Sequence, residues 1–274
     1  MIDCHLHIGH FERSPQDTIN HMDGIGACCA YVMAVEDRDR LPGHPTEAVL
    51  ALAKDFPARV LPGCCVDPRD ENALERVRKY HEQGCVGFGE LKVGLACNDP
   101  RSVAIFKLCA ELGMPVTLHF EEHNYNTDFG AFEEVLNTCP NTVFIGHAQT
   151  WWANLSGKVP EGDYYPQGKV TPGGLVDHWL RDYPNLYGDL SAGSGLNALT
   201  RDPDFTPGFL DRHERKLLFA TDCPCIDGKG TGWPNNMCFA AESVPALERF
   251  SSGEKALNNI LHNNAARLFG QPLI

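Results

Sequence analysis

The sequence predicts an α/β protein that folds as a (β/α)8 barrel, a TIM barrel made of eight parallel strands with helices between them. Eight short apolar runs rich in β-forming residues recur along the chain, and segments with helical periodicity separate them. The length of 274 residues also fits one barrel domain, which typically takes about 250. A doubly wound open sheet is the alternative, but the first strand is not followed by its glycine-rich phosphate-binding turn.

The eight apolar runs give the expected strands. They cover residues 2–8, 29–35, 60–66, 86–93, 115–120, 142–147, 186–190 and 216–221. Three long connections, at 149–170, 191–215 and 222–241, each follow a strand and are rich in Gly, Pro, Asn, Tyr and Trp. In a barrel such connections rise from the face where active sites are built, so we expect ordered lid loops there. No linker or repeat divides the chain, which predicts a single domain over residues 1–274.

Helix starts are predicted where a side-chain oxygen that can cap a helix lies beside a proline. These positions are Thr46 with Glu47 after Pro45, Asp67 with Pro68, Asp99 with Pro100, and Thr171 with Pro172. Two helices are expected to end at Gly84 and Gly113, because glycine readily takes the left-handed conformation of a helix C-terminus.

Composition narrows the class of protein. The net charge of −13 argues against a general nucleic-acid surface, which would need Lys and Arg to neutralise phosphates. No apolar run approaches the roughly 20 residues of a membrane span, and no signal peptide is visible at the N-terminus. We therefore expect a cytoplasmic protein without a membrane partner, in which most of the 12 cysteines are reduced core residues.

The first strand carries the strongest chemical signal, the stretch DCHLH. Side chains alternate between the two faces of a strand, so Asp3, His5 and His7 are expected on one face, and Cys4 and Leu6 on the other. Two imidazoles one step apart on a strand face can chelate a single metal ion. This pair alone could equally be structural.

Other polar side chains stand at the ends of later strands. A charged or imidazole group at the end of a buried strand is costly unless it is paired or bound to a metal. Because the strand ends of a barrel converge, these groups together predict one site: Glu90 and Lys92, His119, His147, Asp189 and Asp222.

Three competing motifs are weaker. The stretch HFEEH, from His119 to His123, matches the H-x-x-E-H pattern of inverted zinc proteases, but that pattern needs a helix and this segment ends a strand. We therefore interpret His123 as a loop residue. The stretch SAGSG lacks the register of a nucleophile elbow, and the spacing of DCPC is too short for a thioredoxin-type thiol pair.

The whole set of strand-end residues resembles the amidohydrolase superfamily, most closely its amidohydrolase-2 branch. The stretches IGHAQTWW, LYGDLSAGSG, LLFATDCP and NNAARLFG extend the resemblance over almost the whole chain. It implies that His5 and His7 bind one divalent metal, with Asp222 as a further ligand and proton acceptor. It also implies that His119 and His147 hold a second metal, or that in a mononuclear enzyme His119 completes the first site and His147 acts as an acid or electrophile.

The fourth strand leaves two candidate ligands. Glu90 and Lys92 share a face, and the resemblance allows either a bridging Glu or a carboxylated Lys; we favour Glu90 as bridge and Lys92 as its positive partner or an anion contact. Asp3, deeper in the barrel, is expected to orient an imidazole. Imidazole and carboxylate ligands suit Zn²⁺, which we favour, as well as Mn²⁺, Fe²⁺ or Ni²⁺.

The predicted activity is hydrolysis of an ester, lactone, amide or related bond in a small molecule by a metal-activated water. The alternative is a mononuclear-metal decarboxylase or hydratase of an aromatic or unsaturated carboxylic acid, and a further alternative is a barrel kept only as a binding scaffold. Trp151, Trp152 and Trp233, with Lys92, are the expected substrate contacts, although these aromatic side chains could instead pack the lids. The sequence is compatible with a homo-oligomer.

Overall fold

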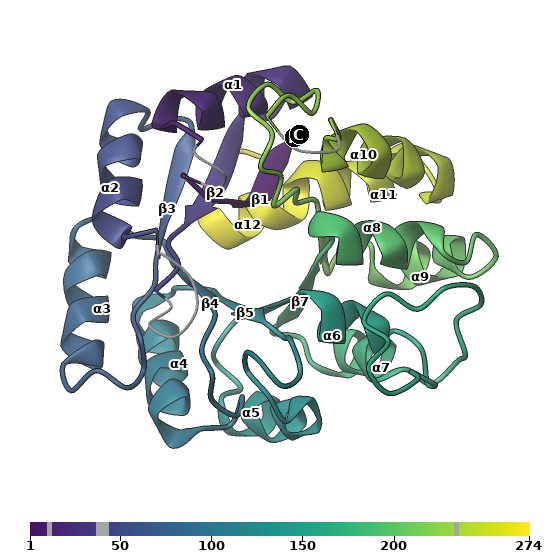
Figure 1. Ribbon diagram of the computed structural model, residues 1–274, viewed down its shortest axis with the longest axis horizontal. Helices are drawn as coiled ribbons and strands as arrows, with labels where there is room; N and C mark the ends of the chain where they lie inside the picture. The colour runs from purple at the N-terminus through teal and green to yellow at the C-terminus, as the bar shows by residue number, and fades with distance from the viewer. Residues whose placement is uncertain (10–12, 37–43, 233–235) are drawn as a thin grey trace.

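The protein is a barrel of eight parallel strands in the order of the sequence, with a ring of helices outside it (Figure 1). The computed structural model describes residues 1–9, 13–36, 44–232 and 236–274. The strands are β1 (Ile2–Leu6), β2 (Cys29–Met33), β3 (Val60–Cys64), β4 (Gly87–Leu91), β5 (Val116–His119), β6 (Phe144–His147), β7 (Leu186–Asp189) and β8 (Leu217–Leu218). Each expected run contains one of them, so the predicted fold class is confirmed.

Backbone hydrogen bonds join the last strand region to the first and close the barrel. The amide of Cys4 donates to the carbonyl of Phe219 at 3.0 Å, and the amide of Asp222 donates to the carbonyl of His5 at 2.8 Å. The second bond fixes Asp222 directly beside the end of β1. Closure of the barrel therefore brings together groups that are 217 positions apart in the sequence.

The helices lie between and beyond the strands. They are α1 (Pro15–Ile25), α2 (Thr46–Asp55), α3 (Ala73–Glu82), α4 (Pro100–Leu112), α5 (Phe132–Thr138), α6 (Gln149–Ala153), α7 (Leu175–Asp182), α8 (Ala192–Thr200), α9 (Thr206–His213), α10 (Phe239–Phe250), α11 (Glu254–Asn258) and α12 (Asn264–Phe269). A 3₁₀ turn, η2 (Phe129–Ala131), precedes α5, and a π-helical turn, η3 (Asn259–Asn263), joins α11 to α12.

Two of the predicted helix starts are confirmed. Helix α2 begins at Thr46, and α4 begins at Pro100 with the carboxylate of Asp99 accepting a bond from the amide of Arg101 at 2.9 Å. The end of α4 is also as predicted, because Gly113 caps it in the left-handed conformation with φ of 68°. Gly84 lies just past the end of α3 and is left-handed as well, with φ of 108°.

The other two predicted starts are wrong. Helix α3 begins at Ala73, because Asp67 forms a turn in which its carboxylate binds the amide and guanidinium of Arg69. Helix α7 begins at Leu175, because the backbone of Thr171 is bonded to the amide of Gly157 and to the hydroxyl of Ser156. A local turn at Asp67 and a contact between two segments at Thr171 therefore override the capping signals.

One predicted lid is also different. The connection 191–215 folds into α8 and α9 instead of an irregular loop, and 149–170 begins with the short helix α6. The first residues of α6 and α8 line the cavity at the strand ends, so regular structure forms part of the mouth of the barrel.

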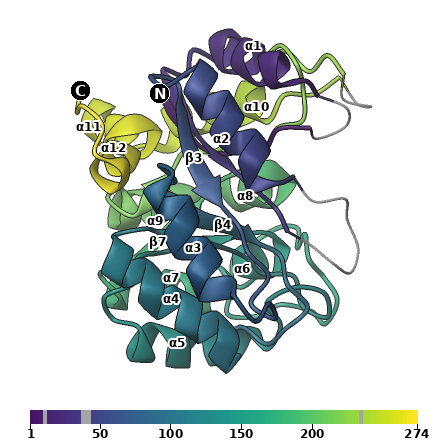
Figure 2. The same cartoon turned by 90° about the vertical axis from the view of Figure 1, so that its left-hand side faces the viewer.

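The opposite end of the barrel is closed by apolar packing. Helix α12 lies across it, where the ring of Phe269 stacks on Tyr31 with centroids 4.7 Å apart (Figure 1). Ile2, Cys4 and Leu218 belong to the same buried cluster. Figure 2 shows both chain termini at this end. Among the described residues, no helix has the length and apolar character needed to cross a bilayer.

Candidate metal centre

The C-terminal ends of the strands gather the predicted site residues in one place. The structure brings together His5 of β1, His7 just after β1, Glu90 of β4, His119 of β5, His147 of β6, Asp189 of β7 and Asp222 after β8. All of these except Asp222 are buried, and the Asp222 side chain is 13% exposed. Burial of so many ionisable groups is unfavourable unless they pair with one another or with cations.

Three of the imidazoles are held by one nitrogen and present the other to the centre. The Nδ1 of His5 lies 2.5 Å from Asp189 Oδ2, the Nδ1 of His7 lies 3.0 Å from the carbonyl of Met33, and the Nδ1 of His147 lies 2.9 Å from Ser191 Oγ. A protonated Nδ1 in each ring leaves the Nε2 lone pair free. This is how histidine ligands of metals are usually oriented.

The first group of potential ligands is His5, His7 and Asp222. The two Nε2 atoms are 3.1 Å apart, and Asp222 Oδ1 lies 3.8 Å and 3.7 Å from them. Ligand atoms around one tetrahedral ion with bonds near 2.1 Å are separated by about 3.4 Å. The spacing and the chemistry of this donor set therefore fit one divalent metal ion.

Glu90 connects this group to a second one formed with His119 and His147. Its Oε2 lies 3.1 Å from His7 Nε2, whereas its Oε1 lies 2.6 Å from His119 Nδ1 and 3.4 Å from His147 Nε2. Each carboxylate oxygen thus faces a different group of imidazoles. This is the arrangement that a carboxylate bridging two metal ions requires.

Lys92 adds a positive charge at the same place. Its Nζ lies 2.9 Å from Glu90 Oε2, so both side chains of the fourth strand reach the centre, as their shared face predicted. Burial alone would raise the pKa of Glu90, but the charges of Lys92 and of His119 hold this pKa well below its ordinary value. Glu90 is therefore a carboxylate.

The histidines respond to the same charges in opposite ways. Burial would lower the pKa of His5, but the surrounding carboxylates, Asp189 first, raise this pKa well above its ordinary value. Burial and the neighbouring His5 lower the pKa of His147. The negative field around His5 favours a cation at its Nε2, either a proton or a metal ion.

A cavity of about 340 Å³ opens over the centre. Lys92, His119, His147 and Asp222 form its floor, and Tyr165 and Phe239 are among its walls. The volume suits a small molecule, and its floor consists of the groups that could react with one.

Three non-glycine residues around the cavity have left-handed backbones. Ala148, Ala192 and Asp222 have φ of 84°, 57° and 46°, and they follow β6, β7 and β8 respectively. Such conformations are unfavourable for residues with a Cβ and concentrate at functional sites. Here they turn the chain sharply where His147, Ser191 and Asp222 enter the centre.

Asp3 does not orient the ring of His5; the imidazole nearest its carboxylate is that of His21, whose Nε2 lies 3.9 Å away. Its carboxylate accepts bonds from the backbone amides of His5 and Thr221 at 3.1 Å and 3.0 Å and from the Thr221 hydroxyl at 2.6 Å, and it does not hold the His5 ring. A register shift between Asp3 and Leu6 interrupts the alternation of faces along β1. Asp3 therefore joins β1 to β8, and Asp189 orients the imidazole of His5.

The expected substrate contacts Trp151 and Trp152 do not reach the cavity. Both are fully buried; Trp151 stacks on Phe120, and the Nε1 of Trp152 donates to the carbonyl of Asp189 at 2.8 Å. Neither tryptophan is therefore a substrate contact, because both side chains pack in the core behind β6 and β7. Tyr165 lines the cavity instead, and Trp233 lies outside the described residues.

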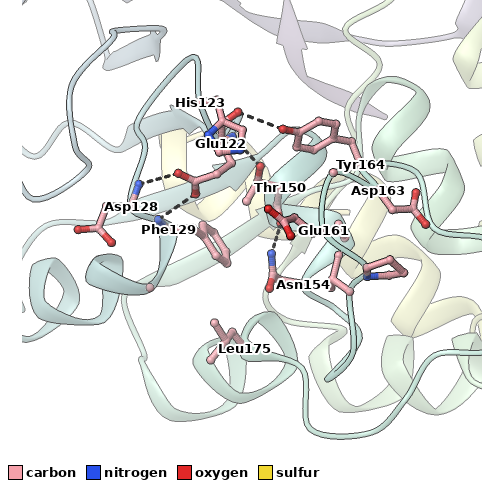
Figure 3. Close-up of a pocket in the computed structure, with 15 residues that line it drawn as sticks. Glu122, His123, Asp128, Phe129, Thr150, Asn154, Glu161, Asp163, Tyr164 and Leu175 are labelled. Atoms are coloured by element: carbon pink, nitrogen blue, oxygen red, sulfur yellow. Dashed lines mark hydrogen bonds between the residues drawn. The ribbon is translucent and has the colours of Figure 1, made fainter.

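A second hollow, of about 470 Å³, is lined by residues that follow β5 and β6 (Figure 3). His123 lines it, in a turn with φ of 71°, so the HFEEH stretch is not helical. The Glu122 carboxylate accepts bonds from the amides of Asp128 and Phe129, and Tyr164 donates to the Glu122 carbonyl. His123 is thus placed away from the proposed ligands, in a hollow with several acidic side chains.

Two residues around the centre were given no role by the sequence. Asp189 was among the expected strand-end residues, and its position at the end of β7 was the signal that could have identified it as the partner of His5. The hydroxyl of Ser191 contacts His147 beside the turn in which Ala192 has a positive φ, and no sequence motif predicts that turn.

Comparisons with known proteins agree with this architecture. A family model described as amidohydrolase matches residues 2–271. Among solved structures, an uncharacterized TIM-barrel protein from Bordetella bronchiseptica has a TM-score of 0.69 at 18% identity, over 93% of this chain and 82% of that chain. A putative 2-pyrone-4,6-dicarboxylic acid hydrolase from Pseudomonas putida has a TM-score of 0.66 at 14% identity, over 100% and 98% of the two chains.

A third structure, a dihydroxybenzoic acid decarboxylase from Polaromonas sp. JS666 with bound manganese and the inhibitor 2-nitroresorcinol, has a TM-score of 0.51 at 14% identity. It covers 92% of this chain and 85% of that chain. At these identities the structural likeness shows the shared fold alone. No curated protein matches the sequence.

Proposed function

We propose a metal-dependent hydrolase activity for this chain, which belongs to the amidohydrolase family. The substrate would be a small molecule with an ester, lactone, amide or related bond. One observation carries the proposal: Glu90 directs one carboxylate oxygen to His7 and the other to His119 and His147. Such a bridge supports two metal ions side by side, an arrangement suited to hydrolysis.

The residues that would hold the metals are His5, His7 and Asp222 on one side and His119 and His147 on the other, with Glu90 between them. Zn²⁺ is the proposed ion, because neutral imidazole and carboxylate ligands suit it. When bound, such ions lower the pKa of a coordinated water to about 7 and polarise the bond to be cleaved.

Asp222 is proposed to move the proton. Its side chain lines the cavity and is 13% exposed. From there it can accept a proton from the attacking water and deliver it to the leaving group. The backbone bond from its amide to the carbonyl of His5 keeps this carboxylate in place.

Lys92 and His147 are proposed to position the substrate. The Nζ of Lys92 stands at the cavity floor, where a negative group of the substrate can approach it. The lowered pKa of His147 keeps its ring neutral near pH 7, so its Nε2 can bind a metal or contact the reacting group. Tyr165 and Phe239 offer ring surfaces to the rest of the molecule.

The test combines metal analysis with substrate screening. We expect two metal ions in the oxygen- and nitrogen-lined centre, hydrolysis of at least one ester, lactone or amide, and loss of one ion and of activity in Glu90→Gln. The exposed Glu134, whose carboxylate accepts a bond from Asn98, gives the matched control Glu134→Gln. A folded Glu90→Gln variant with unchanged metal content and turnover would refute the proposal.

Lys92 also favours a second candidate, decarboxylation of an aromatic or unsaturated acid at a single metal. A cation beside the centre could hold the carboxylate of such a substrate, and His147 or Asp222 could deliver a proton to carbon. One ion in the centre together with CO₂ release from a carboxylic acid would favour this reaction over hydrolysis. A purely binding role predicts that removal of metal changes neither stability nor ligand binding.

A further inference from the structure

A second cluster of potential metal ligands lies apart from the oxygen- and nitrogen-lined centre. It consists of His21 on α1, Cys223 and Cys225 just after β8, and Cys238 at the start of α10. One ligand atom from each residue lies within 4.8 Å of the others, and all four side chains are buried. The four atoms come from three separate segments of the chain.

The distances within this Cys3His cluster are close to those of a filled site. The sulfurs of Cys223 and Cys225 are 3.3 Å apart, and the Nδ1 of His21 lies 3.2 Å from the sulfur of Cys225. With zinc–sulfur bonds near 2.3 Å, two thiolates on one tetrahedral ion are separated by about 3.8 Å. An outward shift of about half an ångström would admit the ion.

The outer contacts of His21 resemble those of metal-bound histidines. Its second nitrogen, Nε2, lies 3.4 Å from the hydroxyl of Thr221 and 3.9 Å from the carboxylate of Asp3. Asp3 also accepts a bond from that hydroxyl at 2.6 Å. Because the Thr221 hydroxyl donates its proton to Asp3, its oxygen can accept from Nε2–H of His21, and in that tautomer Nδ1 carries the lone pair that a metal would use.

A buried cation beside the cluster provides independent support. Arg13 is 3% exposed, and its Nη1 donates to the carbonyl of Cys223 at 2.5 Å. Its Nε and Nη2 have no hydrogen-bond partner among the described residues. Three thiolates and a neutral imidazole around a divalent ion carry a net charge of −1, which a buried guanidinium would balance.

We propose that the Cys3His cluster is a structural zinc site. Four protein ligands fill the tetrahedral shell of the ion, which leaves no position for a substrate, and the thiolates distinguish this site from the centre in the barrel. Binding Zn²⁺ would release the three thiol protons to solvent and involves no change of oxidation state. The proposal does not depend on the reaction catalysed in the barrel.

The position of the site suggests what it stabilises. Cys223 and Cys225 lie at one end of the 222–241 connection, and Cys238 lies near the other end. Helix α1 already packs tightly against this connection, since a Cβ on Gly24 would lie 2.0 Å from the carbonyl of Asp227. The ion would tie both ends of the connection to α1, and Asp222 immediately precedes one of its ligands.

The test uses cobalt as a spectroscopic probe in the full chain. Wild type and a His5→Asn/His7→Asn double variant are purified under reducing conditions, stripped of metal and titrated with CoCl₂. We expect intense near-ultraviolet absorption from thiolate-to-cobalt charge transfer in both proteins. Cys238→Ser should weaken this band, because it removes one of the three thiolates, whereas Cys109→Ser, which changes an equally buried thiol on α4, should leave it unchanged.

A second measurement covers the case in which Cys238→Ser fails to fold. The double variant, loaded with zinc and freed of excess, is treated with p-hydroxymercuribenzoate, and the released zinc is measured with a chromogenic chelator. Release of one equivalent per chain supports the site. The absence of the cobalt band in a folded double variant, an undiminished band in folded Cys238→Ser, or a disulfide among these cysteines in freshly purified protein would overturn it.

Discussion

The substitution Asp189→Asn tests how the centre is oriented. Asp189 is fully buried, its Oδ1 accepts a bond from the amide of Ser191 at 2.8 Å, and its Oδ2 lies 2.5 Å from His5 Nδ1. In the variant the amide of Ser191 keeps the Asn oxygen at the first position. The NH₂ group must then face His5, where it can only donate.

This change would move the proton of the His5 ring. With a donor facing it, Nδ1 must become the acceptor, and the proton then occupies Nε2, the atom that faces the centre. A metal at this position would then lose one lone pair, or the Asn amide and the His5 ring would face each other as two buried donors. Loss of such outer partners lowers metal affinity by about 10- to 100-fold, which is about 1.4 to 2.7 kcal/mol.

The assay is titration of metal-free protein with Zn²⁺ and Mn²⁺ in competition with a chelator of known affinity. Asp177→Asn is the matched control, because Asp177 also binds a buried histidine, His213 Nε2 at 2.6 Å, but does so at α7 and α9, away from the centre. We expect metal affinity to fall in Asp189→Asn and to stay unchanged in Asp177→Asn. Equal affinity in the two folded variants would refute the assignment of Asp189 as the residue that orients His5.

Three further predictions concern stability. Gly146→Ala would place a Cβ 2.5 Å from the buried indole of Trp151 and should cost about 1–3 kcal/mol in urea unfolding, whereas Gly130→Ala, whose Cβ meets nothing within 4 Å, should cost far less. Burial would raise the pKa of Asp177, but hydrogen bonds from His213, and then from Arg212, hold this pKa below its ordinary value. The ionised Asp177 carboxylate therefore contributes to the stability of the folded protein above about pH 3.9. This contribution is lost as the pH falls through the lowered pKa. The destabilisation by Asp177→Asn, about 1–3 kcal/mol at pH 7, should therefore shrink at pH 3, and an equal difference at both pH values would contradict this. Dialysis against a chelator should lower the melting temperature, and an unchanged value would favour a protein that does not use metal.

The sequence alone was sufficient for the barrel. Eight apolar runs separated by helical segments leave few alternatives, since parallel strands need helical crossovers and the chain has the length of one closed ring. Capping signals located α2 and α4 but misplaced α3 and α7, because the side chain of Asp67 binds Arg69 in its own turn and the backbone of Thr171 binds Gly157 in another loop. Local signals define an element, while its first residue depends on contacts made elsewhere.

The identity of the strand-end residues also followed from the sequence, because a buried charge at the end of a strand is unfavourable on its own. Only the tertiary structure decided which atoms face each other. A register shift in β1 turned Asp3 away from the His5 ring, and Asp189 took its place from β7, which only β8 separates from β1 in the closed barrel. Trp151 is likewise buried in the core instead of lining the cavity. The free energy gained by burying a side chain depends on its neighbours in the fold, and sequence spacing does not identify them.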